Sequence, residues 1–289
     1  MNNNQYHFNR RTAVKSSVFG LLAISIPNIL FAREIHTQSD NTVFDPNKLN
    51  GSFPNIDPEL VSTVVGSSHS NLEKVKELVD KRPELARANW EWRFGDWESA
   101  IGAASHVGRR DIVYYLMEKG ARPSIFTFAM LGAYEVVKSM IEFQPGIQKT
   151  MGPHGISLLD HAKYGSRMKD KMSSKERDNL KRLLDYLEAL GDAGGETYMD
   201  VSAEDQEKYL GDYKYGEGST DGFSIKLNMR KDMALGPIGG FGGSLYKVGE
   251  NKFIYNGAPS VNISFAIEKG MVKSLTLKEP TLTITATKV

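Results

Sequence analysis

The chain has 289 residues, of which 40% are hydrophobic and 25% are charged, and this is the balance of a globular protein with room for two modest domains. Its 36 lysines and arginines against 35 aspartates and glutamates leave a formal charge of +1, which excludes a global positive field that would attract nucleic acid or an anionic membrane surface. The absence of cysteine excludes disulfides, thiolate metal sites and cysteine nucleophiles.

The first 32 residues have the pattern of an export signal. Arg10, Arg11 and Lys15 precede an apolar run over 18–31 that ends at the small residue Ala32. The segment 9–15, NRRTAVK, resembles a twin-arginine export motif with alanine where an aromatic residue is usual; the general secretory route is the alternative. The apolar run is shorter than the roughly 20 residues that a membrane-spanning helix needs. We therefore predict a periplasmic or secreted protein with no stable membrane span after signal cleavage.

Residues 33–57 are polar without periodicity and are predicted to be a linker. From 58 to 190, apolar residues recur at helical spacing in successive pairs of short helices. The clearest pair lies in 97–124, where a small-residue helix around Ala103 is followed by a turn at Gly108 and a second helix striped by Ile112 and Leu116. This pattern predicts two packed helices joined by a tight turn.

The order of turn, inner helix and outer helix resembles the ankyrin repeat. Aligning His69 with His106 gives an offset of 37 residues, close to the ankyrin period of about 33, and the excess falls in an enlarged finger at 87–96. The sequence GISLLDHA at 155–162 parallels the turn that opens an ankyrin inner helix. The resemblance implies a solenoid of about four degenerate repeats over 58–190, in which each repeat covers its neighbour's apolar face.

A second domain is expected after the glycine-rich linker at 191–204. From 205 to 289 apolar and polar residues alternate, as at Val261, Ile263 and Phe265, and turn residues separate seven or eight such segments. This predicts a small antiparallel β barrel or sandwich. The sequence YLGDY at 209–213 and the strand at 261–265 resemble the β domain appended to serine β-lactamase-like hydrolases, which implies a lipocalin-like shape and no activity of its own. The expected fold class is therefore multidomain α + β.

All three tryptophans of the chain fall in or beside the enlarged finger. Ankyrin proteins commonly bind partners with their fingers and concave face, and tryptophan and arginine dominate binding energy at interfaces. We therefore predict a protein-partner site formed by Trp90, Trp92, Arg93, Asp96, Trp97 and His106. The alternative is a finger that folds back and buries its aromatic rings on the neighbouring repeat.

Four histidines lie near the predicted helix turns: His69, His106, His154 and His161. Histidines so placed could hold a metal or transfer protons. In ankyrin-type turns, however, histidine often hydrogen-bonds the neighbouring loop, and no carboxylate is spaced along the sequence to complete a ligand set. We therefore predict neither a metal site nor a cofactor.

The sequence contains no complete catalytic set. Ser166 and Lys169 match the Ser-x-x-Lys motif, but the large catalytic domain and its companion motifs are missing. We expect an exported, non-enzymatic binding protein that recognises another protein through aromatic anchors. One alternative is a carrier of a small apolar ligand, or a hydrolase accessory module, with a cavity in the β barrel. Another is an enzyme whose site lies between the two domains.

Overall fold

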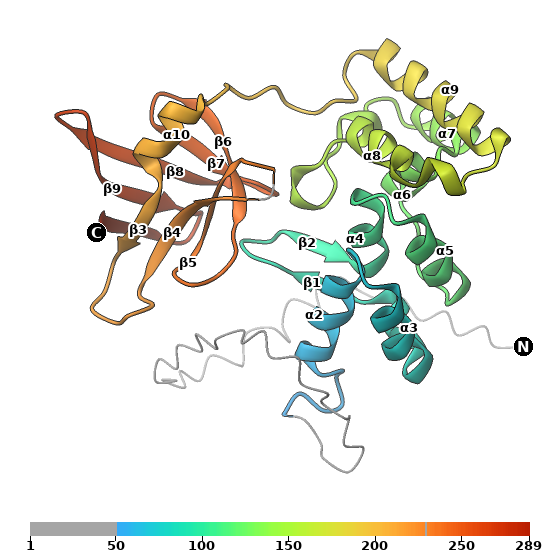
Figure 1. Cartoon of the computed structure of the whole chain (residues 1–289), viewed down its shortest axis with the longest axis horizontal. Coiled ribbons are helices and arrows are strands. Elements are labelled where there is room, and N and C mark those ends of the chain that lie inside the picture. Colours follow the sequence, from blue (N-terminus) through green and yellow to red (C-terminus); the bar gives the residue numbers. More distant parts are fainter. Residues whose placement is uncertain (1–50, 229) are drawn as a thin grey trace, which may run out of the picture. The chain divides into compact units, whose positions relative to one another are not determined.

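The computed structural model describes residues 51–228 and 230–289, which belong to one compact unit, Asp40–Val289. These residues form nine α-helices, four short 3-10 helices and ten strands, so the fold is mixed α + β (Figure 1). The predicted export signal at 1–32 and most of the predicted linker at 33–57 lie outside the described residues.

Eight of these helices follow one another as four successive pairs. The pairs are Pro58–Ser67 (α2) with Leu72–Lys81 (α3), Ala100–His106 (α4) with Arg110–Glu118 (α5), Ile125–Leu131 (α6) with Tyr134–Phe143 (α7), and Leu158–Tyr164 (α8) with Ser174–Leu190 (α9). They lie where the helical spacing of apolar residues predicts them. Short 3-10 helices occupy Pro83–Arg87 (η1), Ile147–Lys149 (η2), Pro153–Gly155 (η3) and Gly165–Lys171 (η4).

Local chemistry sets where these helices begin and turn. Ser99 and Ser157 each accept a hydrogen bond from a backbone N–H in the first turn of α4 and α8, which satisfies a donor that the helix leaves free. Gly108, between α4 and α5, has φ +74°, and a Cβ there would lie 2.2 Å from the carbonyl oxygen of Tyr164. Only glycine fits this left-handed and crowded turn.

The helical region contains two clusters of buried apolar side chains. One is formed mainly by the first two pairs and η1 and includes Met130 of α6, and the other is formed by the last two pairs. Ala100, Ala103 and Ala104 of α4 are fully buried, and α4 contacts α2, α5, α6 and α8. Small side chains allow this close approach, because several neighbours can pack against one short helix without voids.

The C-terminal part of the chain, from 211 to 288, is a closed antiparallel barrel. Its strands are Gly211–Lys214 (β3), Gly222–Leu227 (β4), Met233–Pro237 (β5), Gly243–Gly249 (β6), Lys252–Tyr255 (β7), Ala258–Glu268 (β8), Met271–Lys278 (β9) and Thr283–Lys288 (β10). They pair in sequence order, and β10 closes the barrel against β3. This confirms the predicted antiparallel barrel, and the closed meander is consistent with a lipocalin-like shape. Its interior is occupied by packed side chains that include Tyr213, Phe253 and Phe265.

The barrel is preceded by a helix that the alternating pattern does not predict. Ala203–Tyr209 (α10) lies where the end of the linker and the start of the first strand are expected. Ser202 caps it by accepting from the N–H of Asp205, and acidic side chains in its first turn suit the helix dipole. Seven residues are too few to show a clear helical period in the sequence. Tyr209, the last residue of this helix, packs into the barrel core.

The region of the predicted finger contains a β hairpin. Asn89–Glu91 (β1) pairs antiparallel with Trp97–Ser99 (β2), so that Trp90 lies opposite Glu98. Phe94 and Gly95 have positive φ values of 56° and 85° in the connection. The hairpin follows η1 and leads directly into α4, so its geometry is tied to the helical region.

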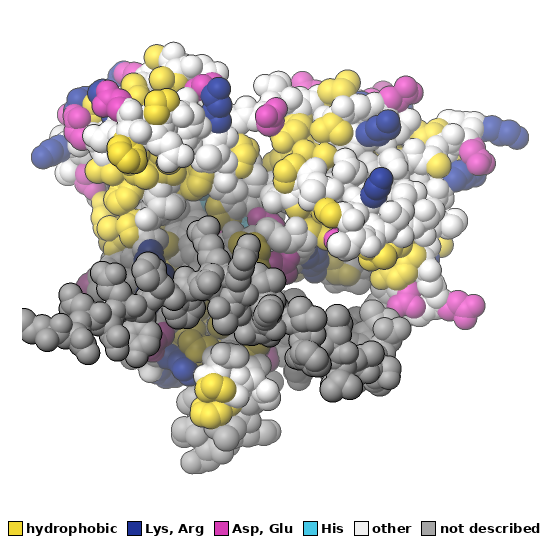
Figure 2. Space-filling model, turned by 180° about the vertical axis from the view of Figure 1, so that it is seen from behind, with side chains coloured by type: hydrophobic (Ala, Val, Ile, Leu, Met, Phe, Trp, Pro, Cys, Tyr) yellow, Lys and Arg dark blue, Asp and Glu magenta, His cyan; other side chains and the backbone are white. Residues whose placement is uncertain are grey.

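The surface carries both signs of charge. On the face in Figure 2, lysine and arginine side chains and aspartate and glutamate side chains are scattered over the described surface, as the formal charge of +1 implies. Among residues 51–228 and 230–289, no helix combines the length and the apolar character that crossing a membrane requires.

Candidate metal centre

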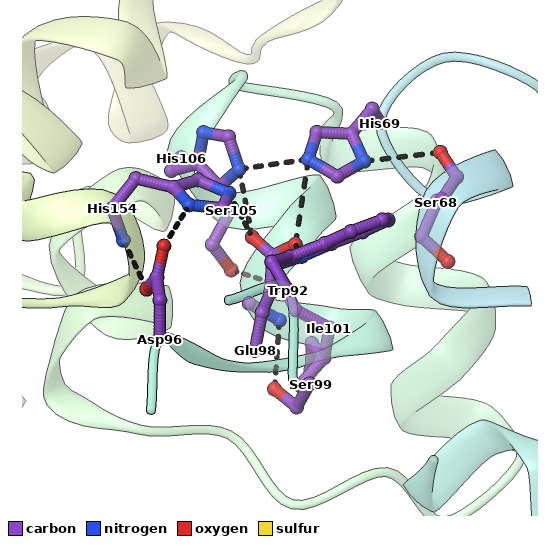
Figure 3. A network of polar contacts seen from close by, with 12 residues as sticks. Ser68, His69, Trp92, Asp96, Glu98, Ser99, Ile101, Ser105, His106 and His154 are labelled. Carbon is purple, nitrogen blue, oxygen red and sulfur yellow. Dashed lines mark hydrogen bonds and ion pairs between the residues drawn. The ribbon is translucent and has the colours of Figure 1, made fainter. Parts of the chain in front are cut away.

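Three histidines and one glutamate converge beside the hairpin (Figure 3). His69, Glu98, His106 and His154 each offer one ligand atom, and these four atoms all lie within 4.8 Å of one another. The residues come from four segments: the turn after α2, strand β2, the end of α4, and η3. The fold therefore brings His69 and His154 to Glu98 and His106, which lie eight residues apart on the adjoining elements β2 and α4.

The spacing of these atoms suits a small cation. Nε2 of His106 lies 2.8 Å from Oε1 of Glu98 and 3.0 Å from Nε2 of His69. Nε2 of His154 lies 3.4 Å from the same Oε1. Zinc–nitrogen and zinc–oxygen bonds of about 2.0–2.1 Å in a tetrahedron place the ligand atoms about 3.3–3.4 Å apart. These three separations are near the tetrahedral value, and an ion at the centre would draw the remaining pairs, which lie within 4.8 Å, closer together.

Hydrogen bonds at Nδ1 orient the rings of His69 and His154, so that Nε2 of each ring points toward the cluster. Nδ1 of His69 lies 3.0 Å from the carbonyl oxygen of Gly66, and Nδ1 of His154 lies 2.7 Å from Oδ2 of Asp96. A carbonyl and a carboxylate accept hydrogen bonds, so each Nδ1 carries the donated proton. In its neutral form each ring therefore presents the lone pair of Nε2 to the cluster, which is the second-sphere arrangement typical of metal-binding histidines.

Glu98 is held by a tryptophan and has one oxygen left over. Nε1 of Trp92 donates to Oε2 of Glu98 at 2.7 Å. Oε1 is buried, and its polar neighbours among the described residues are Nε2 of His106 at 2.8 Å and Nε2 of His154 at 3.4 Å, neither of which forms a well-aligned hydrogen bond with it. A buried carboxylate oxygen held only by such contacts is costly. A cation bound between Oε1 and the imidazoles would satisfy it.

The electrostatics favour an ionised carboxylate at the centre. Burial raises the pKa of Glu98, but hydrogen bonds and charges from His106 and His154 outweigh it and hold the pKa well below its usual range. Burial lowers the pKa of His106. Burial also opposes protonation of His154, yet its bonds to Asp96 and Glu98 raise its pKa to about 10. At neutral pH and without a metal, His154 is therefore protonated and directs its Nε2–H toward Oε1 of Glu98, so a divalent cation would bind by displacing this proton.

The backbone of His154 is held in an uncommon conformation. Its φ of 59° and ψ of 24° lie in the left-handed region, which costs a non-glycine residue about 1–3 kcal/mol. Oδ1 of Asp96 accepts the backbone N–H of His154 at 2.9 Å, while Oδ2 accepts its ring. Asp96 therefore fixes both the backbone and the side chain of this ligand, and backbone strain of this kind is concentrated at functional sites.

No carboxylate is spaced along the sequence to complete a histidine ligand set, yet the structure places Glu98 beside the histidines, because the hairpin brings β2 against the histidine-bearing turns. The sequence spacing of the histidines carries no signal for this, since the ligand belongs to another element. The predicted absence of a metal site is not tested by this geometry. His161 lies outside the cluster, where its Nδ1 lies 2.8 Å from the carbonyl oxygen of Ser157 in its own helix.

The residues predicted to bind a partner have several different surroundings. Asp96 and His106 are both buried: His106 belongs to the cluster, and Asp96 orients His154 from outside it. Trp92 donates to Glu98. Trp90 and Arg93 are half-buried, whereas the side chain of Trp97 is 64% exposed. Partner binding at these residues stays a prediction.

No protein family model matches the chain, and no curated protein matches it in sequence. The ankyrin resemblance and the export signal therefore stay predictions. The candidate metal centre rests on the geometry of the four ligands and of the groups that orient them.

Proposed function

We propose that this protein binds one divalent transition-metal ion of the zinc class through His69, Glu98, His106 and His154. The observation that carries the proposal is the convergence of four ligand atoms within 4.8 Å, with the outer nitrogens of two rings already bonded. Imidazole and carboxylate ligands without sulfur suit zinc. Four protein ligands fill a tetrahedron and leave no position for a reactive water, so the metal has a structural role and the protein is not a metalloenzyme.

Metal content tests the proposal directly. Purified full-length protein is freed of metal with a chelator, exposed to Zn²⁺, desalted and measured by mass spectrometry, with one ion per chain as the expected result. Co²⁺ in place of Zn²⁺ should give the strong visible absorption of a tetrahedral site. His106→Gln should abolish both signals, whereas the matched variant His161→Gln should keep them, because His161 is buried but outside the cluster. Equal uptake by the two variants would contradict the proposal.

For the helical region we propose an ankyrin-type solenoid. Its support is the succession of four helix pairs, the left-handed glycines between pair members at Gly108 and Gly132, and the serine caps of α4 and α8. We also propose export, on the basis of Arg10 and Arg11 ahead of the apolar run. N-terminal sequencing of periplasmic protein should begin near Arg33, and recovery of only full-length cytoplasmic chain would contradict export.

Recognition of another protein is a second candidate function. The specific observation is Trp97, which is exposed on the strand that carries the buried ligand Glu98. A large exposed aromatic ring on a fixed strand is a typical interface anchor. The packed interior of the barrel offers no such support for a small-molecule carrier, so we do not propose that alternative.

A further inference from the structure

The hairpin contacts both buried clusters that flank the candidate metal centre. Trp92 packs against the cluster formed by the first two helix pairs. Phe94 packs against the barrel cluster, with its ring centroid 4.9 Å from that of Tyr255. Asp96 and Glu98 follow on the same hairpin and reach the metal centre. One short element therefore connects the helical core, the barrel core and the ligand set.

The turn between β7 and β8 of the barrel lies directly against the groups that orient the ligands. Gly257 has φ +77°, and a Cβ there would lie 2.6 Å from Cγ of Asp96. A Cβ on Gly155, the residue after the ligand His154, would lie 2.5 Å from Oδ1 of Asn256. These distances leave no room for a side chain on either glycine. The barrel turn therefore packs, backbone to side chain, on Asp96 and on the loop that carries His154.

We infer that the bound metal strengthens the contact between the β barrel and the helical region, a role that we call the latch. This inference rests on the proposed function. Metal bonds to Glu98 and His154 would fix the hairpin and η3, and those two segments form the surface on which Asn256 and Gly257 rest. Without the metal, Oε1 of Glu98 is held only by its contacts with Nε2 of His106 and of His154, and the backbone N–H of His154 donates to Asp96. This contact surface is then held by fewer bonds and opens more easily.

Hydrogen exchange of the full-length protein tests the latch. Peptides that cover 253–258 of the barrel and 94–98 of the hairpin are compared in chelator and in saturating Zn²⁺. We expect zinc to slow exchange in both by at least about tenfold, because local opening must now break metal bonds. A glutamate-specific protease gives a second readout, since Glu196 lies exposed between α9 and α10. Zinc should slow cleavage there by a similar factor, because the segment joins the barrel to the helical region and can adapt to a protease less easily when these two parts stay in contact.

Two glycine variants separate the latch from general stability of the barrel. Gly257→Ala adds a Cβ against Asp96, whereas Gly270→Ala adds one at a similar φ of +78° with nothing within 4 Å. Backbone strain is thus matched, and all four metal ligands are kept. Gly257→Ala should still take up one zinc at saturation, with lower affinity because its Cβ presses on Asp96, but it should lose the zinc-dependent protection of 253–258. Gly270→Ala should keep that protection.

The outcomes distinguish the latch from metal binding itself. Zinc uptake by the unaltered protein with no change at 253–258 or at Glu196 would overturn the latch and leave the proposed function standing. Equal loss of protection in both glycine variants would also overturn it, because the effect would then come from barrel stability. Absence of zinc uptake by the unaltered protein would overturn both the latch and the proposed function.

Discussion

The Nε2 atoms of His69 and His106 face each other at 3.0 Å. His69 already uses its Nδ1 proton on the carbonyl of Gly66, so in the neutral ring its Nε2 can only accept. Nε2 of His106 must therefore donate to Nε2 of His69, although Oε1 of Glu98 lies 2.8 Å from the same nitrogen and is also an acceptor. A metal ion satisfies all of these atoms at once, whereas a single proton satisfies only one contact.

Metal binding should stabilise the fold. A ligand that binds only the native state adds about 2.7 kcal/mol to the free energy of unfolding at a free concentration of 100 Kd. We expect Zn²⁺ to raise the melting temperature, measured by circular dichroism, and a chelator to reverse the rise. Glu98→Gln removes the ligand charge and should abolish the zinc-dependent rise. A rise of equal size in that variant would place the zinc elsewhere.

Asp96 should act on affinity through the orientation of His154. Asp96→Asn keeps the shape of the side chain but removes the charge that orients the imidazole. Loss of such a second-sphere partner lowers metal affinity by about 10–100-fold. The affinity is measured by competition with a coloured chelator. Asp185→Asn, which alters an exposed ion pair on α9, is the control and should leave affinity unchanged. Unchanged affinity in Asp96→Asn would show that the carboxylate does not orient the ligand.

Local patterns predict the framework of this protein well. The helices of the first and second pairs follow from apolar spacing such as Val75 to Val79, and the barrel strands follow from alternation such as Ile263 to Phe265. Each of these patterns lies within a single helix or strand, where the periodicity of apolar residues shows which face is buried. Short elements carry too little of such a signal, and both α10 and the three-residue strands β1 and β2 are unpredicted for that reason.

The candidate metal centre could not be predicted in the same way. His69 and His106 stand at equivalent positions of two helix pairs, and that equivalence is visible in the sequence. Glu98 reaches them only because β2 pairs with β1, and His154 arrives from a 3-10 turn in a left-handed conformation. A ligand set drawn from four segments depends on tertiary packing, so the spacing between its members carries no motif.

His161 should make stability fall on acidification. Burial chiefly lowers its pKa to about 4, from 6.5 for an exposed imidazole, so the folded state favours the neutral ring. The resulting stability is fully present above about pH 6.5 and is lost as the pH falls toward 4. The shift corresponds to roughly 3 kcal/mol between these limits. Urea unfolding at pH 7 and pH 4 in chelator, compared between the native chain and His161→Leu, measures it.

The variant should lose less stability between the two pH values, because leucine has no proton to take up. The four clustered residues are the same in both proteins, so the comparison isolates the contribution of His161. An identical pH dependence in the two proteins would mean that His161 can be protonated in the folded state without cost.

Tryptophan fluorescence should resolve two environments in the hairpin. The side chain of Trp97 is 64% exposed, whereas Trp92 packs on the helical core and donates to Glu98. A soluble quencher should therefore remove a red-shifted component and leave a protected one. Trp97→Phe should eliminate the quenchable component without lowering the melting temperature, because its ring covers little of the core.

Trp92→Phe should lower both the melting temperature and the affinity for Zn²⁺, because it leaves Oε2 of Glu98 without its donor. Equal effects of the two substitutions on zinc affinity would contradict the distinction between an exposed anchor and a group that orients a ligand.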